Sequence, residues 1–481
     1  MGRIDLVFSS AIFLFVFLPV VFILYRLVPS QKIKNLLLAI ASIVFYAFGQ
    51  LHYVPLFLAS VLINYFAGLL LQGSSTRRKL ILAVAVALNI GILCVFKYTD
   101  FAINNLNRAF SLSIPRTGIE LPIGISFFTF QGLSYTIDVY RDKKSGTKDF
   151  LKLLLYISFF PQLIAGPIVK YHDIADQIDN RFCTPDESSY GIRRFITGLA
   201  KKLLIANAVG YIADTVFNTC LPSAVTDWPL MWLGGICYTL QIYYDFSGYS
   251  DMAIGMGWMF GFRFRENFNY PYAASSIKDF WRRWHISLSS WFKEYLYIPL
   301  GGNRKGKGRT VFNKLLVFFC TGIWHGANWT FVFWGFGHGL LSSLEDLGVI
   351  PAEKLSRSRG GRLISKAYTL LAVMLLFVVF RADSIAQAFY MIGRMFTGET
   401  SRYGLYLFRS LLDPAACFVI AIAFLFAGRL PLLVREGIEK HGYAEKSAFC
   451  VLSVVFFLAL YVVCIMSLAR GGFNPFIYFQ F

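Results

Sequence analysis

The sequence is poor in charged residues. Only 15% of its 481 residues are Asp, Glu, Lys or Arg, whereas 56% are hydrophobic and 17% are aromatic. A soluble domain averages about 25% charged residues, because it must cover its core with a polar shell. In lipid no such shell is needed. The shortage therefore excludes a large soluble protein and predicts an integral membrane protein.

Acidic residues are fewer than basic ones. The sequence has 27 Asp and Glu against 46 Lys and Arg, so its net charge is +19. Such an excess can indicate nucleic-acid binding. Here the basic residues cluster in short segments between apolar runs, which is the pattern that the positive-inside rule predicts for membrane proteins. We therefore expect contact with membrane lipid and no nucleic-acid partner.

Several sequence signatures are also missing. The eight cysteines have no CxxC spacing and lie mostly in apolar runs, so neither a metal site nor a disulfide framework is indicated. No Gly-Xaa-Ser-Xaa-Gly elbow and no HExxH pair occurs, which leaves a soluble-type serine or zinc hydrolase without support. No small-residue cleavage site follows the apolar stretch from Leu6 to Val28, which we interpret as a first transmembrane helix.

Long apolar runs are what the sequence does have. They lie at 6–28, 36–50, 52–71, 80–96, 122–139, 151–168, 195–217, 229–247, 250–262, 312–344, 364–381, 411–427 and 447–468. Some are too short or too polar for a simple span, so we predict about eleven transmembrane helices plus re-entrant or interfacial helices. No internal repeat and no long polar stretch occurs. The prediction is an all-α polytopic protein with one membrane domain over residues 1–481.

Charge gives the orientation. The basic segments at 32–34, 77–79 and 141–152 are each separated by two predicted crossings, so all of them can lie in the cytoplasm. Both chain termini are then expected outside. The apolar region 315–344 has basic segments at both ends but is too short for two full crossings. We expect it to be re-entrant, unless one of these two basic segments does not lie in the cytoplasm.

Two histidines lie in aromatic, apolar surroundings. His325 is flanked by Trp324 and Trp329, and His285 follows Trp281-Arg282-Arg283-Trp284. An ionisable residue at membrane depth is a functional candidate by default, although a lone histidine is more often a structural residue bonded to a neighbouring helix. Two such histidines in so apolar a chain favour a site.

Acyl transfer suits these residues. A buried, uncharged imidazole can take the proton from a hydroxyl as it attacks a thioester. Nearby donors can stabilise the oxyanion that develops, and Asn328, the indole of Trp324 or Trp329, and Arg283 are candidates. His338 lies thirteen residues after His325, which is not one helical face, so we expect it to be structural or to support the site.

Three segments around these histidines resemble the membrane-bound O-acyltransferase (MBOAT) family, most closely its bacterial alginate O-acetylation membrane subunits. They are Trp281–Ser289, Tyr295–Arg304 and Gly322–Trp329. Weaker matches extend the resemblance over nearly the whole chain: Val7–Ser10, Leu121–Gln131, Phe160–Ile168, Asp245–Asp251 and Phe380–Asp383. Each match alone is weak, but their ordered set is specific.

The resemblance implies a helical fold around a funnel in the bacterial inner membrane, with His325 catalytic and His285 the second functional histidine. It also implies a cytoplasmic thioester donor, acetyl-CoA or an acyl carrier protein, with no bound cofactor and no metal. An extracytoplasmic SGNH-type transferase or related subunit would complete transfer to a polysaccharide or cell-wall polymer. The histidine segments fit the acetyl-transferring branch better than the D-alanine branch.

The basic segment with Arg304, Lys305, Lys307 and Arg309 has two interpretations. It can attract an anionic thioester donor, or it can be ordinary positive-inside topology.

The aromatic tail 474–481 is expected outside the cytoplasm and also has two interpretations. Tyr478 can be part of an interfacial anchor, or it can be an acyl relay like the tyrosine in the similar terminal motif of the D-alanine system's small partner.

Three alternatives to acetyl transfer stay open. The first is D-alanyl transfer from an acyl carrier protein. The second is a transporter or lipid flippase, for which inverted repeats and paired broken helices would be expected and neither is found. The third is a non-catalytic scaffold of a polysaccharide-secretion complex, which would tolerate alanine in place of His325.

Overall fold

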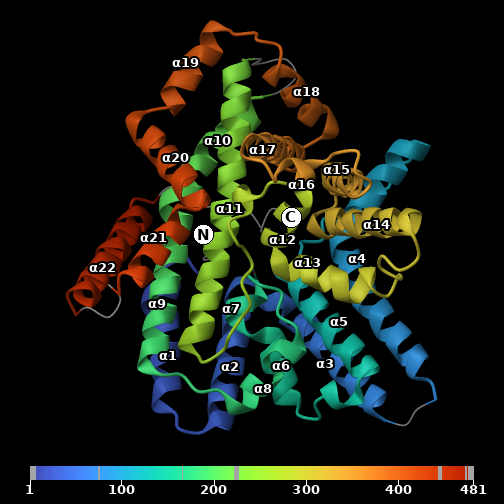
Figure 1. Ribbon diagram of the computed structural model, residues 1–481. Coiled ribbons are helices and arrows are strands. Elements are labelled where there is room, and N and C mark those ends of the chain that lie inside the picture. The colour runs from blue at the N-terminus through green and yellow to red at the C-terminus, as the bar shows by residue number, and fades with distance from the viewer. Residues whose placement is uncertain are drawn as a thin grey trace. The chain divides into compact units, whose positions relative to one another are not determined.

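The computed structural model describes residues 7–73, 76–164, 166–220, 227–442, 447–471 and 474 (Figure 1). These residues form helices joined by turns and loops, and no strand occurs among them. The all-α prediction is confirmed. Tyr478 and most of the predicted tail lie outside the described residues.

The chain divides into two compact units, Met1–Phe195 with Tyr249–Glu266, and Ile196–Gly248 with Asn267–Phe481. The single domain predicted over 1–481 stays a prediction. In the first unit the helices are η1 (Phe13–Phe17), α1 (Leu18–Leu27), α2 (Gln31–Gln50), η2 (Leu51–Tyr53), α3 (Val54–Gln72), α4 (Arg78–Phe110), α5 (Ile125–Arg141), η3 (Lys143–Ser145), α6 (Phe150–Ser158), α7 (Phe160–Leu163), α8 (Tyr171–Asn180) and most of α9 (Pro185–Ala200).

The second unit begins at the end of α9 and contains η4 (Lys201–Ala206), α10 (Asn207–Thr219), most of α11 (Trp228–Met259), η5 (Pro271–Ala273), α12 (Ile277–Arg283), α13 (Ile286–Phe292), η6 (Lys293–Tyr297), α14 (Lys307–His325), α15 (Trp329–Asp346), α16 (Ala352–Leu355), α17 (Arg359–Arg381), α18 (Ile385–Met395), α19 (Arg402–Leu411), α20 (Pro414–Ala427), α21 (Leu430–Lys440) and α22 (Ser447–Ala469).

Among the described residues, five helical stretches are long and apolar enough to cross a membrane. They are Gln31–Gln72, Arg78–Phe110, Pro185–Thr219, Arg359–Arg381 and Ser447–Ala469. A sixth results if α19 and α20, which meet at 69°, form one broken span. The chain is therefore a multi-pass membrane protein, while the count of about eleven crossings stays a prediction.

Helix boundaries differ from the apolar runs in three places. The run 229–247 and most of the run 250–262 form one helix, α11, because Gly248 and Tyr249 between them do not interrupt it. The run 80–96 continues in α4 to Phe110, since polar side chains near its end are still compatible with a helix. The run 151–168 divides at Phe159 into α6 and α7, where Pro161 follows. Proline removes a backbone donor and disfavours helix before it.

Buried amides join three apolar helices of the first unit. The side chains of Asn64 in α3 and Asn89 in α4 donate to each other's carbonyl oxygen at 3.0 and 3.2 Å. The hydroxyl of Thr136 in α5 donates to Asn64 Oδ1 at 2.8 Å. Such hydrogen bonds between transmembrane helices contribute about 0.6 kcal/mol each on average. These hydrogen bonds help to set the orientation of the three helices, because lipid provides no hydrophobic force that drives helices together.

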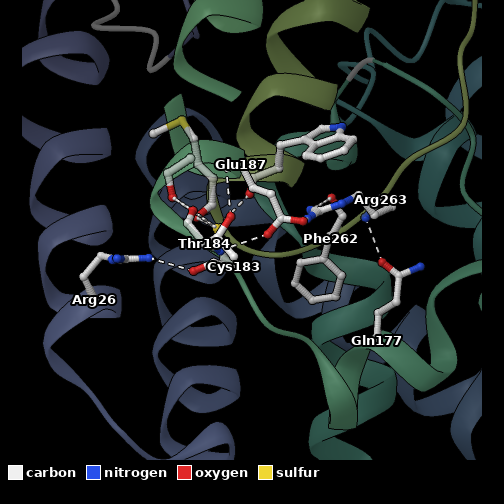
Figure 2. Close-up of polar contacts among 10 residues, drawn as sticks. Arg26, Gln177, Cys183, Thr184, Glu187, Phe262 and Arg263 are labelled. Carbon is white, nitrogen blue, oxygen red and sulfur yellow. Dashed lines mark hydrogen bonds and ion pairs between the residues drawn. The ribbon is translucent and has the colours of Figure 1, made fainter. Parts of the chain in front are cut away.

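Figure 2 shows the polar contacts at the start of α9. The hydroxyl of Thr184 accepts from the N–H of Glu187 at 3.2 Å, and the Glu187 carboxylate accepts from the N–H of Thr184 at 2.9 Å. This reciprocal pair is a capping box. Glu187 also pairs with Arg263 at 2.5 Å, and Arg26 donates to the carbonyl of Cys183 at 3.0 Å. The contacts fix the extended segment before α9 to α1 and to the chain after α11.

Helices α14 and α15 form an antiparallel hairpin in the second unit (Figure 1). Their backbones approach closely at glycines. A Cβ on Gly322 would lie 2.3 Å from the carbonyl oxygen of Phe331, and one on Gly335 would lie 2.3 Å from that of Phe318. A methyl group fits at neither position, so glycine sets the separation of the two helices. The hairpin agrees with the re-entrant interpretation of 315–344, whose depth in the membrane stays a prediction.

Gly335→Ala should therefore destabilise the hairpin. The added methyl meets the Phe318 carbonyl, a backbone atom that moves only with α14, and such overpacking costs roughly 1–3 kcal/mol. The measurement is thermal unfolding of the detergent-purified protein, in which we expect a melting temperature several degrees lower. Gly308→Ala in α14 is the matched control, because no atom lies within 4 Å of its new Cβ. Equal melting temperatures for the two variants would contradict the close approach.

Candidate functional site

A short turn places His325 at the tip of the hairpin. α14 ends at His325 and α15 begins at Trp329. Asn328 caps α15 by accepting from the N–H of Thr330 at 3.2 Å, and it donates to the carbonyl of Asp383 at 3.0 Å. A Cβ on Gly326 would lie 2.1 Å from the ring of Phe331, so only glycine fits beside the histidine. The oxygen and the nitrogen of the Asn328 side-chain amide thus both hold the turn.

Aromatic rings surround the imidazole of His325, which is 6% exposed. The ring centroids of Trp324, Trp334 and Phe380 lie 4.9, 5.1 and 5.2 Å from its own. The interplanar angles are 80°, 88° and 79°. In perpendicular packing the positive edge of one ring meets the negative face of the other. The surroundings of His325 are thus apolar, but the rings still present partial charges to one another.

His285 links α12 to α13 and is completely buried. Its φ of 42° is in the left-handed region, which is uncommon for a residue other than glycine and is typical of strained functional positions. Its Nδ1 lies 3.1 Å from the side-chain oxygen of Asn267. Because that oxygen only accepts, Nδ1 carries the proton and Nε2 keeps its lone pair. Among the described residues, no hydrogen-bond partner of Nε2 is found.

The two histidines belong to one chain of rings. The ring of His285 lies 5.9 Å from that of Trp324, which packs on His325. On the other side of His325, the ring of Trp334 contacts His338 at 5.1 Å. The structure thus brings together His285, Trp324 and His325, three of the candidate site residues, and places Trp334 and His338 beside them.

The structure places His338 one ring away from His325, and its expected role as a structural or supporting residue stays a prediction. Thirteen residues separate the two histidines, a spacing that would put them on different faces of one continuous helix. The turn at 326–328 instead makes α15 run back alongside α14, which carries His338 into the same cluster. Among the described residues, neither ring nitrogen of His338 and neither indole N–H of Trp281 and Trp334 has a hydrogen-bond partner. No sequence spacing indicates this cluster, although the glycines of α14 and α15 are a signal for the hairpin.

A buried carboxylate fixes α12 to the hairpin. Glu345, in the last turn of α15, accepts from the N–H groups of Ile277 and Lys278 at 2.7 and 3.1 Å. Burial raises the pKa of Glu345. Burial also acts to raise the pKa of its neighbour Asp346, but hydrogen bonds from Lys314 and Lys278 outweigh it and hold that pKa below its ordinary value. These contacts position the segment that carries Trp281 and His285.

Arg283 makes polar contacts of its own, and the predicted basic segment lies at the far end of α14. Arg283 pairs with Asp279 at 2.9 Å and donates to the carbonyl of Asn269. The basic residues Arg304, Lys305, Lys307 and Arg309 are exposed at the opposite end of α14 from His325. At 1.5 Å per residue, the length of α14 separates the two by about 27 Å. The basic segment therefore has no direct access to His325.

Sequence reasoning missed one buried ion pair near the cluster. Lys202 in η4 and Asp245 in α11 pair at 2.7 Å, and both side chains are 2% exposed. Phe246, the residue after Asp245, packs on the ring of His285 at 4.6 Å. The segment Asp245–Asp251 carries part of the family resemblance, which was the available signal, but that resemblance assigns no role to the pair.

Comparison with known proteins agrees with these segments. A sequence profile of the membrane-bound O-acyltransferase family matches residues 126–381, a range that contains His285, His325 and His338. The probable alginate O-acetylase AlgI of Pseudomonas putida is 39% identical over 496 aligned residues, covering 99% of this chain and 100% of that protein. The peptidoglycan O-acetyltransferase of Helicobacter pylori is 38% identical over 372 residues, 70% of each chain.

Similarity to a D-alanyl-transferring protein is lower and more local. The teichoic acid D-alanyltransferase of Bacillus subtilis is 30% identical over 233 residues, which cover 46% of this chain and 57% of that protein. The resemblance carried by the histidine segments is thus confirmed over the full length of the sequence. The chain belongs to the membrane-bound O-acyltransferase family and is a membrane O-acyltransferase.

Proposed function

We propose that this O-acyltransferase takes an acetyl group from a cytoplasmic thioester donor and passes it across the inner membrane for O-acetylation of an extracytoplasmic polysaccharide. The observation that carries the proposal is the similarity to the probable alginate O-acetylase of P. putida along the whole chain. The similarity to a peptidoglycan O-acetyltransferase supports a glycan acceptor. Similarity to a D-alanyltransferase over less than half of the chain favours acetyl over D-alanyl transfer.

His325 is proposed as the general base. It takes the proton of the acceptor hydroxyl, whose oxygen bonds to the acyl carbon while the carbon–sulfur bond breaks. The leaving thiolate then receives that proton from the imidazolium, so no proton is gained or lost overall. Burial of His325 in an aromatic cluster excludes the water that would hydrolyse the thioester.

The neighbouring residues take supporting roles in this proposal. His285 is the second functional histidine, and the lone pair of its Nε2 orients a substrate hydroxyl by accepting a hydrogen bond from it. Trp324 remains a candidate donor to the oxyanion, as does Arg283. Asn328 acts as support, because the nitrogen and the oxygen of its side-chain amide both hold the turn beside His325.

Replacement of His325 tests the assignment. We expect His325→Ala to lose transfer by about 10²–10⁴-fold, the usual cost of losing a general base. The measurement is acetyl transfer by purified protein matched for quantity and melting temperature. His441→Ala, which changes an exposed histidine at the end of α21, is the control and should retain wild-type transfer. Retention of more than about a tenth of the activity in His325→Ala would refute the base assignment.

The exposed basic segment is proposed to attract the anionic donor, whether coenzyme A or a phosphopantetheine carrier. Arg304→Glu with Lys305→Glu should raise the apparent KM for the donor with little change in kcat, because local donor concentration falls while the chemistry at His325 is untouched. The matched control reverses Lys354 and Arg357, which are equally exposed on another basic segment. If the double variant Arg304→Glu with Lys305→Glu keeps both its KM for the donor and its membrane topology, the basic segment serves only positive-inside topology.

Tyr478 lies outside the described residues and its role as an acyl relay remains a proposal, with the interfacial anchor as the alternative. A phenol ester transfers its acyl group more readily than an alkyl ester, so a relay would divide one long transfer into two short ones. Tyr478→Phe keeps the ring and removes the hydroxyl. We expect loss of polymer acetylation, together with an acetyl-tyrosine in the wild-type protein by mass spectrometry. Normal acetylation in Tyr478→Phe would establish the anchor instead.

A partner on the outer side is also part of the proposal. The extracytoplasmic C-terminus would deliver the acyl group to an SGNH-type transferase or related subunit, which completes transfer to the polymer. An adjacent gene for such an esterase-like protein would support this assignment. A carrier protein and its ligase in that position would support an aminoacyl donor.

A further inference from the structure

Phe380 is a residue of the family resemblance to which the proposed function gives no role. It lies in the last turn of α17 and is 2% exposed. Its ring packs on three others that border the site: His325 at 5.2 Å, Trp334 at 4.9 Å and Phe331 at 4.8 Å. The segment Phe380–Asp383 therefore reaches the site through the first of its residues.

The ring geometry favours a positive charge on His325. Trp324, Trp334 and Phe380 stand at 79–88° to the imidazole within 5.2 Å. In perpendicular packing one ring presents its edge to the face of the other. Because an imidazole has only two faces, at least one of the three rings can receive the imidazole edge on its own face. A cation within about 6 Å of such a face is attracted by the ring quadrupole, most strongly where water is excluded.

We infer that Phe380, with Trp324 and Trp334, forms an aromatic cage that stabilises the imidazolium of His325 as it develops in the transition state. The inference rests on the proposed role of His325 as the base. Phe380 is then a positioning residue that acts on the reaction through His325. The cage does for this histidine what a carboxylate does in many hydrolases, without placing a second charge in the membrane.

The cage acts at one defined moment. Before transfer the imidazole of His325 is neutral, so its electrostatic attraction to the faces of the surrounding rings is weak. When the acceptor proton moves to the imidazole and the oxygen–carbon bond forms, the rings face a cation. When the thiolate leaves and takes this proton, the charge disappears. The cage thus favours the transition state over the ground state, which is the condition for raising kcat without lowering KM.

Several charged and titratable groups lie around the cage, and the experiment described below changes none of them. On α17, Arg381 pairs with Asp214 at 2.7 Å, and the side chain of Asp383 after it is 81% exposed. On the other elements these groups are His338 in α15, His285 before α13 and the Lys202–Asp245 pair. Fluorination of a phenylalanine ring alters none of these charges.

The experiment replaces Phe380 with 4-fluoro-, 3,4-difluoro- and 3,4,5-trifluorophenylalanine by site-specific incorporation. Each fluorine withdraws charge from the ring face while leaving the shape of the ring nearly unchanged. We expect log kcat for acetyl transfer to fall in steps with the number of fluorines. The expected loss is about 3- to 10-fold for the trifluoro variant, with KM unchanged. A role in packing alone predicts no such trend.

Phe377 provides the matched control. It lies in the same helix, is fully buried, and packs on Phe280, Trp284 and Phe380. The same fluorinated series at Phe377 should leave kcat unchanged. A flat series at Phe380, or an equal slope at Phe377, would overturn the cage while leaving the base assignment intact. Retained transfer in His325→Ala would instead refute the base assignment on which the cage rests.

Discussion

The site depends on the close approach of two helix backbones. α14 and α15 touch where Gly322 faces the carbonyl of Phe331 and Gly335 faces that of Phe318. Because no side chain separates the helices there, the turn between them is short and His325 lies at the tip of a rigid hairpin. The same geometry carries Trp334 and His338 back toward the tip. Without the glycines, the two helices would separate and the aromatic cluster around His325 would open.

Polar groups are used sparingly, and nearly always to fix positions. In the first unit, paired amides join α3 to α4, and a capping box fixes the start of α9. In the second unit, Glu345 holds α12 against the hairpin, and Lys202 pairs with Asp245 beside the His285 region. An unpaired polar group is costly at membrane depth. Within the described part of the chain, Nε2 of His285 and both ring nitrogens of His338 have no hydrogen-bond partner. This cost makes them informative, because such groups mark places where a substrate or water is expected.

The sequence predicts the helical class, the membrane location, the family and the two histidine segments, because these depend on local composition and on ordered motifs. It does not predict the chain of rings. The spacing of His338 from His325 matches no helical face, so the sequence does not indicate that the two share a cluster, and only the turn at 326–328 brings them together. Asn267 was missed because its role depends on the left-handed backbone of His285. Phe380 was recognised as part of a motif, but its role follows from contacts between segments distant in the sequence.

The glycine contacts of the hairpin also bear on how this family can be recombined. Each contact pairs a position in α14 with one in α15, so the surfaces of the two helices fit each other. In a recombinant of two family members, both helices should therefore come from the same protein. A chimera that joins two relatives between Gly322 and Gly335 combines helices selected against different partners. One that exchanges the whole block from Lys307 to Asp346 keeps every matched contact. In gene-shuffling experiments, the natural crossover points therefore lie in the polar segments that flank the hairpin.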